Sequence, residues 1–73
     1  MDSMRVVCDK ALHEINIGKT NIANCIAIQG KTVEFSEGTE RKRAISELVK
    51  LQIALKELEN AIENIRRAMM HKS

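Results

Sequence analysis

The sequence predicts an α+β fold in which two antiparallel helices pack on a β-hairpin, and the spacing of apolar residues supports it. Apolar residues recur at helical spacing over about residues 3–17 and again over about 39–70. Over about 22–35 they alternate instead with small or polar residues. A chain of 73 residues forms one domain and buries only about 60% of its unfolded surface. We therefore expect one thin core and a long, heptad-patterned second helix.

The first helix is indicated by a single apolar stripe along residues 3–17. Asp2 or Ser3 can cap its start by accepting a hydrogen bond from an unpaired backbone N–H group. Gly18 stands where a left-handed residue would end the helix. The stripe consists of Met4, Val7, Cys8, Ala11, Leu12 and Ile15.

The β-hairpin is predicted over residues 22–35, where the apolar period shortens to two. Val33 and Phe35 alternate with polar neighbours, and Gly30 lies between two apolar runs. Glycine supplies the positive φ that a tight hairpin turn needs, and a two-residue turn there pairs Ile26 with Val33. Because an isolated hairpin is unstable in water, its apolar face must pack on the helices.

The second helix is predicted over about residues 39–70, after a turn in which Ser36 or Thr39 can act as the N-cap. Apolar residues then alternate spacings of three and four, as the a and d positions of three heptads do. This seam consists of Leu48, Leu51, Leu55, Leu58, Ile62, Ile65 and Met69. The predicted core consists of Leu12, Ile15, Ile26, Val33, Phe35, Leu48 and Leu51.

The predicted helix lengths differ, and this difference points to a partner. A helix over residues 39–70 runs about 48 Å, whereas one over 3–17 covers about 22 Å. The far end of the seam would then lie exposed, and contiguous exposed apolar surface usually marks an interface. The alternative is that the second helix breaks near Asn60 and folds back. The expected interface residues are Leu55, Leu58, Ile62, Ile65 and Met69.

The residue types argue against an enzyme, a metal site or a cofactor site. No nucleophile motif, phosphate-binding loop or dinucleotide-binding glycine pattern is present, and the carboxylates are scattered. The only soft-metal ligands lack the close spacing of a zinc site. With two cysteines and no signal peptide, we expect a reduced, intracellular setting, and no apolar run is long enough to span a membrane. These ligands are Cys8, His13, Cys25 and His71.

Two basic clusters stand out against a net charge of only +2. They are the run Arg41-Lys42-Arg43 and a C-terminal cluster of Arg66, Arg67 and Lys72. The first cluster falls where the helix macrodipole disfavours cations, so helix stability does not account for it. Two interpretations stay open: a solvated face, or contact with an acidic protein surface or a DNA backbone.

Several short motifs, in this order, resemble the family of head-to-tail joining protein W of lambda-like phages. The resemblance covers roughly residues 10–50, but here the heptads continue to Met69, beyond the end of the family's second helix. The motifs are Ala11-Leu12-His13-Glu14-Ile15, Gly18-Lys19, Gly30-Lys31-Thr32-Val33-Glu34-Phe35-Ser36 and Ile45-Ser46-Glu47-Leu48.

This resemblance implies an α+β fold and a structural role in the virion, at the head–tail interface, after synthesis in the host cytoplasm. The chain would form a homo-oligomeric ring below the portal protein, complete the head and dock the next connector or tail protein. It would also contact the backbone of packaged DNA non-specifically. The competing hypothesis is a small cytosolic coiled-coil adaptor, chaperone or regulator that dimerises through its C-terminal helix.

Overall fold

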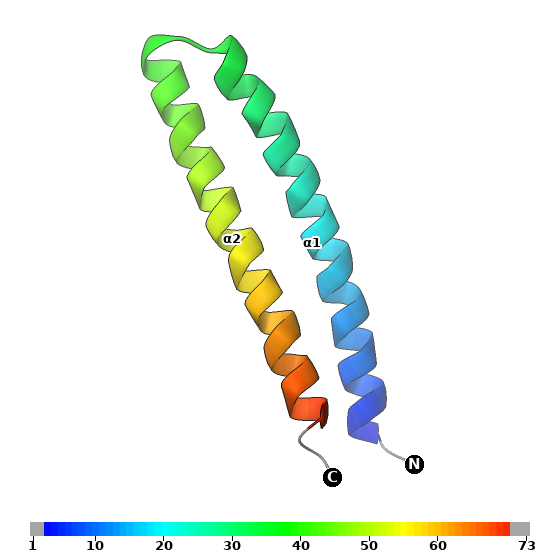
Figure 1. Cartoon of the computed structure of the whole chain (residues 1–73). Coiled ribbons are helices and arrows are strands. Elements are labelled where there is room, and N and C mark those ends of the chain that lie inside the picture. The colour runs from blue at the N-terminus through cyan, green and yellow to red at the C-terminus, as the bar shows by residue number, and fades with distance from the viewer. Residues whose placement is uncertain (1–2, 71–73) are drawn as a thin grey trace.

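The computed structural model describes residues 3–70, which form two antiparallel α-helices (Figure 1). Helix α1 spans Ser3–Phe35 and helix α2 spans Gly38–Met70, so each contains 33 residues. The two helices run side by side, with the link between them at one end of the molecule. The hairpin extends over 57 × 16 × 11 Å and is therefore a rod with one helix–helix seam.

The predicted β-hairpin is wrong, because residues 22–35 continue helix α1 and the described residues contain no strand. The α+β fold class is accordingly replaced by an all-α helical hairpin. The physical reason is that the apolar residues of this segment also fit a heptad pattern. This pattern continues, without a shift, the one that begins near the N-terminal end of α1. Its inward positions alternate spacings of four and three: Cys8, Leu12, Ile15, Lys19, Ile22, Ile26, Gln29 and Val33.

Two glycines that were expected to interrupt the helix lie inside α1 instead. Gly18 was predicted to end the first helix and Gly30 to form a turn, yet both lie inside α1 and neither has a positive φ. A glycine inside a helix costs about 1 kcal/mol relative to alanine. This cost is small compared with what a seam along two 33-residue helices contributes, so the helix continues through both positions.

The link between the helices is closed by polar contacts around Ser36. Its backbone N–H donates to the Val33 carbonyl oxygen at 3.4 Å, and its hydroxyl donates to the Thr32 carbonyl oxygen at 2.5 Å. Ser36 therefore terminates α1 rather than capping α2. Helix α2 begins at Gly38, whose φ of 60° is the left-handed conformation that glycine tolerates without strain.

The long second helix is confirmed, and its seam residues are buried or half-buried along its length where it contacts α1. Ala44 and Ile62 are the most buried residues described, at 5% and 6% exposure. Six of the seven predicted core residues are half-buried in this seam. Phe35 was also placed in the core, and this is wrong: it is 84% exposed, because it lies on the outward side of the last turn of α1.

The hairpin exposes much more surface than a compact protein of its size. Its accessible area is 5928 Å², against about 4,500 Å² expected for a folded monomer of this mass. Its radius of gyration is 16.7 Å, against about 11 Å for a compact domain of the same length. A two-helix hairpin thus leaves roughly 1,400 Å² more in water than a compact fold would.

Candidate interaction surfaces

The predicted interface residues of α2 lie in the seam against α1 of the same chain. They are Leu55, Leu58, Ile62, Ile65 and Met69, of which Ile62 is buried and the others are half-buried. The expectation of an exposed seam assumed a first helix of about fifteen residues, and α1 is more than twice that long. Contact between these residues and another chain stays a prediction, but the length argument no longer supports it.

Two polar side chains interrupt the apolar seam on α1, and sequence analysis did not single them out. The ammonium group of Lys19 lies 3.7 Å from a carboxylate oxygen of Glu59. The side-chain amide of Gln29 donates to the Ala44 carbonyl oxygen at 3.1 Å and to a Glu47 carboxylate oxygen at 3.3 Å. Polar groups at core positions of paired helices fix register and orientation, so these contacts tie α1 to one alignment on α2.

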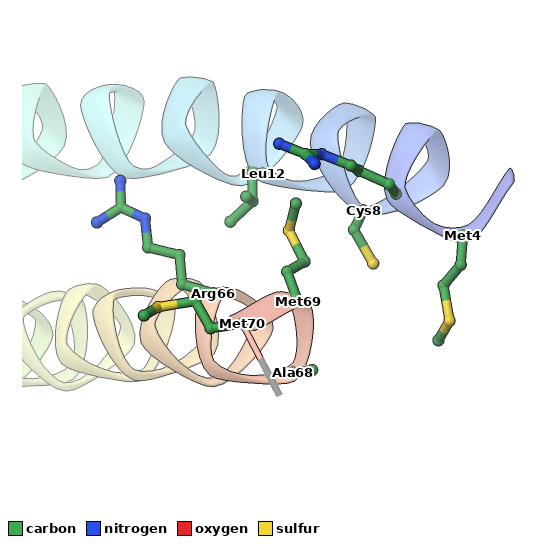
Figure 2. Close-up of a pocket in the computed structure, with 8 residues that line it drawn as sticks. Met4, Cys8, Leu12, Arg66, Ala68, Met69 and Met70 are labelled. Carbon is green, nitrogen blue, oxygen red and sulfur yellow. The ribbon is translucent and has the colours of Figure 1, made fainter. Parts of the chain in front are cut away.

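A groove of about 370 Å³ opens between the free ends of the two helices (Figure 2). Leu12 and Cys8 point from α1 toward α2, and Met69 points from α2 toward α1. Met4, Ala68, Met70 and two arginines complete the lining, which is mainly apolar. Methionine side chains adapt to irregular surfaces, so this groove suits an apolar side chain better than a reacting group.

The described residues hold no cluster of side chains that could bind a metal ion. Within residues 3–70, no three His, Cys, Asp or Glu side chains gather as ligands, and no buried side-chain polar atom lacks a partner. Cys8 is half-buried and Cys25 is exposed, both as free thiols. They stand about 25 Å apart along one helix, too far for a disulfide within the chain. The fourth candidate ligand, His71, lies outside the described residues.

The two basic clusters lie at opposite ends of α2, about 35 Å apart, and do not form one surface. Arg41, Lys42 and Arg43 are all exposed, but successive helical residues point about 100° apart, so the three do not share one face of α2. In the second cluster, Arg67 pairs with Glu63 at 3.3 Å, and Lys72 lies outside the described residues. Contact of either cluster with DNA or an acidic surface stays a prediction.

Large apolar side chains are exposed on both helices, away from the seam. On α2 three of them follow one ridge at intervals of four residues: Ile45, Val49 and Ile53. On α1 they include Ile17, Ile28 and Phe35. Sequence analysis missed both sets, because it assigned part of α1 to a hairpin and attended only to the main seam of α2.

Comparison with known proteins adds no family or relative. No protein-family model, no curated protein and no solved structure matches the chain. The resemblance to the phage joining proteins therefore rests on the short motifs alone. Neither α1 nor α2 contains a stretch long and apolar enough to cross a lipid bilayer.

Proposed function

We propose that this chain is a non-catalytic assembly module, a helical hairpin that acts by associating with a second copy of itself. The observation that carries the proposal is the excess of exposed surface on a chain with two residues buried in its described part. A single seam between two helices gives little burial, and small domains of this size commonly gain the missing stabilisation by oligomerisation. Both roles considered for the sequence include self-association, and a dimer of two hairpins corresponds to the adaptor role.

The alternative role as a phage head–tail connector loses its main structural argument. The β-hairpin distinguished a connector from a simple helical adaptor, and residues 22–35 are helical instead. The connector role and its partners, the portal protein and the next tail protein, stay hypotheses that rest on the order of short motifs.

The groove at the open end is lined mainly by apolar side chains, which suits contact with an apolar side chain of a partner.

The proposal is tested by thermal unfolding at a series of protein concentrations, followed by far-ultraviolet circular dichroism. If folding is coupled to self-association, the unfolding midpoint rises with concentration by mass action. A midpoint independent of concentration, from a chain that sediments as a monomer throughout, would contradict the proposal.

A further inference from the structure

The outward side of α1 carries no charge over residues 15–30. Lys19 is the one charged residue in this stretch, and it is turned inward to pair with Glu59. The stretch is about 22 Å long, or more than four helical turns. A solvated helix face normally carries charges, and depletion of charge distinguishes the core of a protein interface from the rest of a surface.

Two exposed isoleucines mark the ends of this uncharged surface. Ile17 is 50% exposed and Ile28 is 66% exposed. They are eleven residues apart, which is about three turns, so they lie on the same side of α1. Asn21 and Asn24 lie between them on that side. We call these four residues the outer α1 face.

Charged residues of opposite sign bound the outer α1 face. Glu14 precedes Ile17 by three residues, and Lys31 follows Ile28 by three. The resulting spacings of three, four, three, four and three are those of a second coiled-coil seam on the side of α1 that faces away from α2. Both charged residues are exposed.

We propose that the outer α1 face binds the same face of a second copy in antiparallel orientation. The two α1 helices would cross at a two-fold axis between Ile22 and Ala23. This arrangement sets Ile17 against Ile28 of the second copy, and Asn21 against Asn24. It also sets Glu14 against Lys31. Each of these pairs of facing residues therefore joins chemically matched side chains: apolar with apolar, amide with amide, and acid with base. Because the axis is two-fold, each of these contacts occurs twice.

The opposite orientation is disfavoured by charge. A parallel pairing in register sets Glu14 against Glu14 and Lys31 against Lys31 of the second copy, and like charges at neighbouring positions are destabilising. The asparagine layers cost stability relative to apolar residues but fix the alignment.

The exposed ridge of α2 fits a second copy less well. Lys42 and Lys56 flank Ile45, Val49 and Ile53 on the same side of the helix. Antiparallel pairing about Val49 sets Lys42 against Lys56, and parallel pairing sets each lysine against its own copy. Self-pairing of this ridge therefore brings lysines together in either direction.

The available area is sufficient for such a dimer. A stable interface buries about 800 Å² on each partner, and the hairpin exposes roughly 1,400 Å² more than a compact monomer. This inference rests on the proposed self-association and adds the face and the orientation.

The test reverses the bounding charges. Glu14→Lys alone and Lys31→Glu alone should each weaken self-association about tenfold, since each sets like charges together twice. The double variant, and an equimolar mixture of the two single variants, should recover the wild-type affinity. Within one chain these residues are about 25 Å apart, so recovery requires contact between copies. Glu57→Lys, on α2, is the matched control and should leave the affinity unchanged.

The outcomes separate the two proposals. If the wild-type chain dimerises but the single variants bind as tightly as it does, or the mixture fails to recover, the outer α1 face is not the interface, while self-association stands. If the wild-type chain is a monomer throughout, both proposals fail. Helix content, measured in the same samples, should be equal for the variants and the control at matched degrees of association.

Discussion

Replacing Gly18 and Gly30 by alanine should stabilise the protein, because both glycines lie in the interior of a helix. Neither has a positive φ, and a Cβ atom added at either position meets nothing within 4 Å. The gain therefore comes from helix propensity alone, about 0.8–1.0 kcal/mol at each site. The two sites are about 18 Å apart, so their effects should add to about 2 kcal/mol.

This gain is a large fraction of the free energy of unfolding, which is about 4–11 kcal/mol for a domain of this length. It should raise the unfolding midpoint by roughly 8–16 °C, measured by circular dichroism at one fixed protein concentration. Gly38→Ala is the matched contrast and should lower the midpoint, because φ is 60° there. A loss of stability in Gly30→Ala would refute the reasoning, since a β-turn with positive φ at Gly30 predicts that result.

Three further predictions follow from the seam and the basic cluster. Ile62→Ala should lower the free energy of unfolding by about 2–5 kcal/mol in chemical denaturation, because Ile62 is the most buried large side chain described. A loss below about 1 kcal/mol would show that Ile62 is not part of the packed seam. A double-mutant cycle on Lys19→Ala and Glu59→Ala should give a coupling of at most about 1 kcal/mol that falls as salt rises, because both side chains are partly exposed. Reversal of Arg41, Lys42 and Arg43 to Glu should leave stability unchanged or slightly higher, since anions suit a helix N-terminus. If the cluster binds DNA backbone, the same variant should lose a salt-dependent affinity for duplex DNA that the wild-type chain shows.

The sequence predicted α2 well because nothing in it competes with the helical pattern. Its apolar residues keep one heptad frame from Ala44 to Met69, with no glycine or proline inside. The structure places this helix over Gly38–Met70, within one residue of the expected start. A long and uninterrupted apolar period is the kind of signal that is least ambiguous.

The same method failed on α1 for two physical reasons. Lys19 and Gln29 occupy inward positions of its heptad frame, so the apolar period is broken where the chain uses polar contacts with α2. Between them, Ile22 and Ile26 also alternate with small residues, and a short apolar run of this kind fits a strand and a buried helix equally well. Gly18 and Gly30 then suggested boundaries, although a glycine in a helix costs only about 1 kcal/mol.

The error in α1 carried over to the interaction surfaces. A short first helix would have exposed Ile62 and its neighbours, whereas the 33-residue helix covers them. The uncharged outer α1 face could have been found from the sequence only after residues 15–30 were known to be helical, because strand geometry would place Ile17 and Ile28 on unrelated surfaces.

Sedimentation equilibrium over a wide range of protein concentrations tests the central claim, self-association of a helical hairpin, most directly. The chain has a mass of 8.2 kDa, and the account predicts a reversible shift toward twice that mass as concentration rises. Helix content should rise over the same range, because association stabilises the hairpin. A mass that stays at 8.2 kDa at every concentration, with helix content unchanged, would contradict the account.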